Sequence, residues 1–141
     1  MYCTLDDIKK LLPEEILIQL TDDEGNGTVD QGRVDEAIAQ ADAEIDSYCA
    51  VKYRVPFDPV PDLLRKCSVD LAVYNLYSRR VEEIPQTRTD RYRNAIRQLE
   101  GISKGTISLG VDPPPQSGTQ SERPDISGPA RIFSRSRMED L

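Results

Sequence analysis

The sequence predicts an all-α protein: a compact bundle of four to five helices, two short and three long, with at most one short strand and a flexible C-terminal tail. Three observations support this prediction. Apolar residues recur at helical spacing through most of the first 110 residues. Prolines and glycines separate these segments from one another. Beyond residue 110 the composition is rich in Pro, Ser and Gly, with too few apolar residues for a core. We therefore expect one helical domain, residues 1–110, followed by a tail, residues 111–141.

Two short helices are expected near the N-terminus. Thr4 is suited to cap the first because its hydroxyl can accept a backbone N–H, and Asp7 three residues later completes a capping box. Pro13 is suited to begin the second, since proline lacks the N–H that stays unpaired in a first helical turn. Helices this short depend on packing for their stability.

The loop TDDEGNGTVD, residues 21–30, partly matches a calcium-binding loop. Aligned on Gly27, it places polar residues at EF-hand positions one, three, five and nine: Asp22, Glu24, Asn26 and Asp30. Position twelve must supply a bidentate Glu, but here it is Arg33. A positive charge at that position disfavours calcium, and the alternative is a structural turn that caps the next helix.

The stretch from Thr28 to Pro56 predicts the central helix of the domain. Its apolar residues follow one narrow stripe: Val34, Ala37, Ile38, Ala41, Ile45, Tyr48 and Cys49. Either Thr28 or Asp30 is suited to cap its start, and Gln31 would complete a capping box on Thr28. Pro56 prevents the helix from continuing.

A second long helix, residues 62–80, is apolar over most of its circumference, which predicts that it lies at the centre of the bundle. Pro61 is suited to be its first residue. Asp70 interrupts the apolar pattern, and Lys66 one turn earlier is suited to pair with this carboxylate.

The third long helix is expected to begin at Thr87 or Thr89 and to end at Ser103, because Gly105 is a typical helix stop. If the fold contains its one short strand, we expect it at residues 106–109. Several arginines lie on this helix, but their directions spread around it instead of forming one strip for nucleic acid.

Composition argues against an enzyme. The chain has no histidine, so it lacks the usual general base and the commonest zinc ligand. No catalytic, cofactor-binding or metal-binding residues are predicted, and no small-molecule substrate. The three cysteines, odd in number and widely spaced, are expected to be reduced thiols. A net charge of −7 and the lack of a long apolar run predict a soluble cytoplasmic protein that binds neither membranes nor specific nucleic-acid sequences.

Charge is distributed unevenly along the chain. Residues 1–48 contain 13 acidic and 3 basic side chains, whereas residues 49–110 contain 11 basic and 7 acidic ones. Either the acidic and basic helices of one subunit neutralise each other, or the acidic face of one copy meets the basic face of the next, as in a head-to-tail ring. The sequence does not separate these two arrangements.

The predicted tail has two parts. Residues 113–130 have the composition of a disordered tether, whose root-mean-square reach is roughly 23 Å. Apolar and arginine residues reappear at its tip, residues 131–138, which is typical of a docking peptide. The residues expected to bind a neighbour are Arg131, Ile132, Phe133, Arg135 and Met138.

Several segments carry a resemblance to a known family: TDDEGNGTVD, AEIDSYCAVKYRVPF, LRKCSVDLAVYNLY, LEGISKGTISLG and, near the C-terminus, RIFSRSRM. Together they resemble the neck proteins of Mu-like phages and prophages over most of the chain. The most specific segment is AEIDSYCAVKYRVPF, where the family typically has an aliphatic residue in place of Cys49.

The resemblance implies a structural protein of the capsid vertex, a head–tail connector or head-completion adaptor that forms a ring below the portal. Its implied partners are further copies of itself and the phage portal and tail proteins, and its implied location is the host cytoplasm and then the virion neck. The residues implied to fix the central helix and its exit are Tyr48, Tyr53, Arg54, Val55 and Pro56. Two alternatives stay open: a calcium-responsive module that uses residues 22–30, and a regulatory protein that binds another polypeptide through its acidic half.

Overall fold

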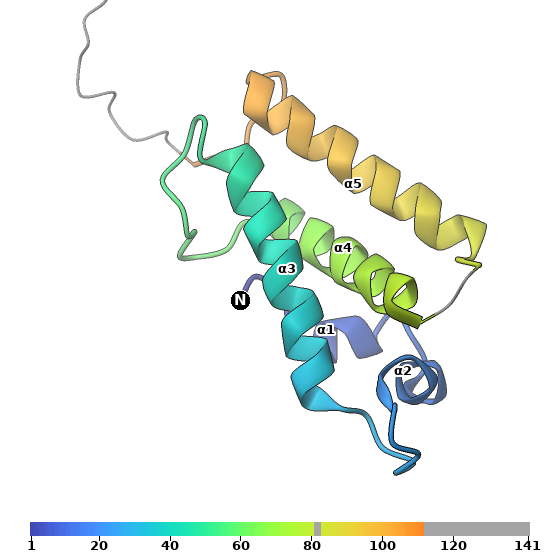
Figure 1. The fold of residues 1–141 in the computed structure, drawn as a ribbon. Helices are drawn as coiled ribbons and strands as arrows, with labels where there is room; N and C mark the ends of the chain where they lie inside the picture. Colours follow the sequence, from blue (N-terminus) through green and yellow to red (C-terminus); the bar gives the residue numbers. More distant parts are fainter. Residues whose placement is uncertain (81–82, 112–141) are drawn as a thin grey trace, which may run out of the picture.

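A computed structural model describes residues 1–80 and 83–111, which form five α-helices and no strand (Figure 1). The helices are α1 (Leu5–Lys9), α2 (Glu14–Thr21), α3 (Gln31–Cys49), α4 (Asp62–Arg80) and α5 (Gln86–Lys104). The predicted all-α bundle with two short and three long helices is therefore confirmed. Residues 106–109, where at most one short strand was predicted, form bends and irregular structure instead. None of the five helices combines the length and apolar character needed to cross a membrane.

Three of the helices begin directly after a proline. The carbonyl oxygens of Pro13, Pro61 and Pro85 accept the first helical hydrogen bonds of α2, α4 and α5, over 3.2, 3.1 and 3.2 Å. The prolines thus occupy the N-cap position. Pro13 and Pro61 were predicted to be the first residues of their helices, which instead begin one residue later. Helix α5 correspondingly begins at Gln86, earlier than the predicted Thr87 or Thr89, because Pro85 already has the extended backbone of a cap.

Helix α4 is the centre of the bundle, as its apolar circumference predicts. It contacts each of the other four helices, with α3 and α5 along its length and the two short helices against its remaining side (Figure 1). Its fully buried apolar side chains are Leu64, Cys67, Leu71, Ala72, Val73 and Leu76. Burial of such side chains is the main stabilising term of a helical bundle, at roughly 25 cal/mol per Å² of apolar surface.

The N-terminal residues belong to this core. Tyr2 and Cys3 are 4% and 1% exposed, and they precede the predicted capping box of Thr4 and Asp7, which is present. Cys3 lies directly before the cap, and Ile8 is buried four residues after it. This arrangement is a hydrophobic staple, which fixes the direction from which the chain enters α1.

Asp30 caps α3, so one of the two predicted alternatives is correct. Its carboxylate accepts a hydrogen bond from the Arg33 backbone N–H over 3.3 Å. The capping box of Gln31 on Thr28 is wrong, because the Gln31 side chain instead donates to Asp35 over 2.8 Å. An Asp directly before the first turn leaves no place for a second cap two residues earlier.

Candidate functional site

Residues 50–61, which we call the exit segment, connect α3 to α4 and are held in place by Tyr2. The Tyr2 hydroxyl accepts a hydrogen bond from the Phe57 backbone N–H over 3.2 Å and donates one to the Asp46 carboxylate. The Tyr2 backbone N–H donates to Asp42 over 3.0 Å. Burial raises the pKa of the Tyr2 hydroxyl well above its ordinary value, and the hydrogen bond to Asp46 adds to this shift. The N-terminus therefore ties the exit segment to α3.

The residues after α5 complete this end of the molecule. The Phe57 ring lies 6.2 Å from the Tyr2 ring and 5.8 Å from the Tyr53 ring, measured between centroids. The Tyr53 hydroxyl in turn accepts a hydrogen bond from the Leu109 backbone N–H over 3.5 Å. Three distant parts of the chain thus meet here, and Figure 1 shows the last described residues beside the exit segment.

An open cavity of about 430 Å³ lies where the exit segment meets residues 105–111. Lys52 and Tyr53 line it from one side, and Ile107 and Val111 line it from the other. Val51, next to Lys52, is 67% exposed, and Val111 is 39% exposed. Met1 is the other large apolar side chain that is exposed in the described part of the chain. Val51 and Val111 thus give this end apolar surface at the point where residue 112 follows.

The residues marked by the family resemblance lie at this end of α3 but do not form one surface. Tyr48 lies in the last turn of α3, half-buried against the core. Tyr53 and Val55 are also half-buried and pack on the core, which suits the expected role of holding the helix exit. Arg54 and Pro56 are exposed.

The expected docking residues of the tail lie outside the described part of the chain: Arg131, Ile132, Phe133, Arg135 and Met138. The division between a domain and a tail, and the role of these five residues, stay predictions.

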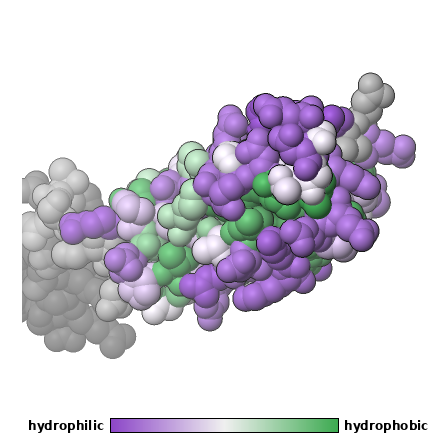
Figure 2. All heavy atoms as spheres, turned by 90° about the horizontal axis from the view of Figure 1, so that it is seen from below, coloured by the Kyte–Doolittle hydropathy of each residue, from purple (hydrophilic) through white to green (hydrophobic). Residues whose placement is uncertain are grey.

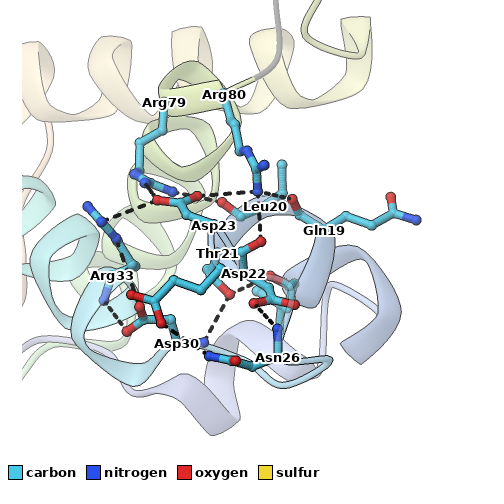
Figure 3. A network of polar contacts seen from close by, with 12 residues as sticks. Gln19, Leu20, Thr21, Asp22, Asp23, Asn26, Asp30, Arg33, Arg79 and Arg80 are labelled. Carbon is cyan, nitrogen blue, oxygen red and sulfur yellow. Dashed lines mark hydrogen bonds and ion pairs between the residues drawn. The ribbon is translucent and has the colours of Figure 1, made fainter.

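The loop that resembles a calcium site is held by a polar network (Figure 3). Asp22 accepts hydrogen bonds from the backbone N–H groups of Asn26 and Gly27, over 2.9 and 2.8 Å. Gly27 has φ of +73°, a left-handed conformation that glycine adopts without strain. These N–H groups, that of Gly27 first, lower the pKa of the Asp22 carboxyl. The carboxylate therefore closes a turn of the protein backbone.

Asp23 joins this loop to the C-terminal end of α4. Its carboxylate lies 2.7 Å from Arg79, 3.2 Å from Arg80 and 3.2 Å from Arg33. The hydrogen bond from Arg79 is the main reason that the pKa of the Asp23 carboxyl is lowered. Figure 3 shows the three guanidinium groups converging on this side chain.

The geometry of the loop argues for a structural turn. Arg33, at the position where an EF-hand needs a bidentate Glu, pairs with Asp23 and lies 3.9 Å from the Asp30 carboxylate. Within residues 1–80 and 83–111, no three His, Cys, Asp or Glu side chains are placed to hold one metal ion. The carboxylates of Asp22, Asp23 and Asp30 thus already bind backbone N–H groups and arginines of the protein.

A groove of about 340 Å³ lies between α1, α4 and one arginine of α5. Asp70 reaches it although the residue is only 3% exposed, and it pairs with Lys66 at 3.0 Å, as predicted, and with Arg91 at 3.4 Å. Leu11 and Val69 give the groove an apolar lining. Figure 2, which views the molecule from below, shows that hydrophobic residues on this face lie between hydrophilic borders. The groove is shaped by a structural ion-pair cluster.

The described residues thus form a packed helical body with a groove and an exposed apolar end on its surface. The profile of the family described as Bacteriophage Mu, Gp36 matches residues 2–127. The chain belongs to this Gp36 family. Membership confirms the resemblance to Mu-like phage and prophage proteins, and the match includes both the exit segment and the loop of residues 21–30.

Two relatives illustrate the relationship. "Gene product J" of Escherichia phage Mu is 31% identical over 112 residues, which are 78% of this chain and 77% of the phage protein. The "Mu-like prophage FluMu protein gp36" of Haemophilus influenzae is 37% identical over 84 residues, or 60% of this chain. The matched stretch spans 57% of the FluMu protein.

Two sets of contacts that hold the surface segments of this Gp36-family chain were not predicted from the sequence. Tyr2 was not predicted to hold the exit segment, although an aromatic residue and Cys3 before a capped helix were a signal for a staple. Arg79 and Arg80 were not predicted to bind the loop of residues 21–30, because they are more than 50 residues away and no local pattern connects them.

Proposed function

We propose that this chain is a structural protein at the head–tail junction of a Mu-like phage, where it acts as a head–tail connector or head-completion adaptor and assembles as a ring at the portal vertex. The observation that carries the proposal is the Gp36 match over residues 2–127. Its partners would be further copies of the chain and the portal and tail proteins. Such a role needs no catalytic residue, cofactor or metal.

The described structure suits this role. Three parts of the chain meet at one end: Tyr2, the exit segment and residues 105–111. Hydrogen bonds and packed aromatic rings hold this end together, so it offers a firm base for whatever follows residue 111. Junction proteins need a rigid body together with segments that become ordered on binding a neighbour.

The tail is the proposed contact to a neighbouring protein. Residues 113–130 would span roughly 23 Å as a coil, enough to leave the subunit from which they start. Residues 131–138 would then bind through Ile132, Phe133 and Met138, whose apolar side chains are flanked by arginines.

Deletion of residues 111–141 tests the proposal. We expect the truncated protein to keep the helical circular dichroism and, within a few degrees, the melting temperature of the full chain. In a prophage whose own gene is removed, the truncated protein should fail to restore infectious particles, and electron microscopy should show separate heads and tails. Normal yields of infectious phage would contradict the proposed role of the tail as an arm that binds a neighbouring protein.

A matched pair of full-length variants separates docking from tail length. One replaces Ile132, Phe133 and Met138 by Ser, and the other replaces Gln116, Ser117 and Thr119 by Ala. The first variant should fail to give particles in which heads and tails are joined, and the second variant should give them normally. Equal yields from the two would show that the tip has no specific contact.

A further inference from the structure

The uneven charge of the chain is not neutralised within the described subunit. Thirteen acidic side chains lie in residues 1–48, and among described ion pairs only Asp23 pairs with the basic second half, through Arg79 and Arg80. Asp70 pairs with Lys66 and Arg91 of its own half, and each of the remaining pairs likewise joins two groups of the same half. Neutralisation within one subunit, one of the two arrangements open from the sequence, thus accounts for little of the charge.

Unpaired acidic groups collect at one end of the molecule. Residues 14–36, which we call the acidic end, comprise α2, the loop and the first turns of α3, with eight acidic side chains and Arg33 as the one base. Glu15, Glu24 and Glu36 are exposed there, and none of them has an ion-pair partner among the described residues. The three arginines that reach this end are all directed to Asp23.

Unpaired basic groups collect on α5. Arg93, Arg97 and Lys104 are exposed, and positions four and seven residues apart lie on the same side of a helix. No ion pair to these three residues, which we call the basic strip, occurs in residues 1–80 and 83–111. The strip is not evident in the sequence, because Arg88, Arg91, Arg93 and Arg97 together spread around the helix, and only the fold shows that Arg91 pairs with Asp70.

Figure 1 shows the C-terminal half of α5 at the far end of the molecule from α2 and the loop, with α4 between them. Arg97 and Lys104 belong to this half of α5, and Arg93 lies near the middle of the helix. A single copy cannot bring the basic strip and the acidic end together, whereas two copies in the same orientation can. We propose that the basic strip of one copy binds the acidic end of the next copy, in a head-to-tail contact that repeats around an assembly. This inference rests on the proposed ring and names the surfaces that form it.

A second copy fits the basic strip better than nucleic acid does. Asp90 and Glu100 lie on the same exposed side of α5 as the strip, and the chain carries a net charge of −7. Both features disfavour a continuous phosphate backbone, which presents negative charge along its whole length. A folded acidic surface can instead place single carboxylates beside the basic residues of the strip, which compensates for the general repulsion. A heterologous contact between two different surfaces is also what closes a ring.

Charge reversal tests the contact in the full chain. Sedimentation at about 20 mM and about 500 mM salt should show self-association that weakens at high salt, because screening acts on exposed charges. Arg93→Glu/Arg97→Glu and, separately, Glu24→Lys/Glu36→Lys should each weaken association about tenfold or more, as attraction becomes repulsion. The control Lys10→Glu/Arg65→Glu carries the same change in charge as the first variant, at exposed positions elsewhere, and should associate like the unchanged chain.

The decisive samples combine the two reversals. An equimolar mixture of the two variants should associate again, because each now offers a surface that matches the other, and the fourfold variant should associate with itself. If association is recovered in both samples, misfolding is also excluded as the reason that each variant alone associates weakly. Association unaffected by either reversal would overturn this contact and leave a ring built from other surfaces possible. An unchanged chain that stays monomeric at low salt would overturn it as well, while deletion of the tail still tests the junction role separately.

Discussion

Tyr2 shows how one side chain joins distant parts of this protein. Its hydroxyl binds the exit segment at Phe57 and α3 at Asp46, and its backbone N–H binds Asp42. Asp42 accepts a further hydrogen bond from Ser68 of α4, over 2.8 Å. The N-terminus, α3, α4 and the exit segment therefore share one connected set of buried and half-buried polar groups, in which each donor has an acceptor.

Replacing Tyr2 by Phe should lower the free energy of unfolding by about 1–2 kcal/mol, since the Asp46 carboxylate and the Phe57 N–H each lose a partner. Amide hydrogen exchange at Phe57 should become faster, and chemical denaturation measures the loss of stability. Tyr53→Phe is the control, because its hydroxyl makes one long hydrogen bond of 3.5 Å. A smaller effect for Tyr2→Phe than for the control would contradict the role given to Tyr2.

The three cysteines give a prediction about pH. Burial is the main cause that raises the pKa of each thiol, Cys3, Cys49 and Cys67, to about 11 from an ordinary value of 9.0. Unfolded chains therefore lose these protons first, so stability is retained below pH 9 and falls as the pH rises from 9 to 11. Urea midpoints measured across this range should decrease.

Thiol labelling provides the matching control. In the folded protein at pH 8 a thiol reagent should modify none of the three buried cysteines, whereas in denaturant it should modify all of them. Cys49→Ala should make the decline of stability with pH less steep, because one of the shifted groups is gone. Rapid labelling of the native protein would show that the thiols are accessible.

At the scale of elements, the loop of residues 21–30 depends on α4. Asp23→Ala should lower the free energy of unfolding measurably, since three guanidinium groups lose their common partner. Hydrogen exchange should become faster at Asn26 and Gly27 and remain slow in α5. Glu24→Ala, at an exposed neighbour in the same loop, should change stability by less than about 0.5 kcal/mol. Equal effects of the two substitutions would show that the arginines do not hold the loop.

The elements themselves were largely predictable because their signals are local. Helical spacing of apolar residues located all five helices, and Pro13 and Pro61 marked the starts of α2 and α4 to within a residue. The pairing of Asp70 with Lys66 also followed from their spacing of four residues. Contacts between elements were missed, such as Arg91 to Asp70 and Arg79 to Asp23, because helix packing decides them and the sequence shows no period for them.

At the scale of the whole molecule, two features suit a part that is built into an assembly. The acidic end lies far from the C-terminal half of α5, and its charge is complementary to that of the basic strip, as the proposed contact between successive copies requires. The end formed by Tyr2, the exit segment and residues 105–111 precedes the proposed arm. The candidate site was only partly predictable: the exit residues Tyr53 and Val55 were named from the resemblance, but the separation of charge between two ends needs the fold to be seen.

The central claim is that this Gp36-family chain is part of the head–tail junction, and reconstruction of purified virions by cryo-electron microscopy tests it most directly. We expect a ring of helical bodies between the portal and the tail into which residues 1–111 fit, with α5 of each copy facing residues 14–36 of the next. Virions that lack the chain, or that carry it away from the neck, would contradict the claim.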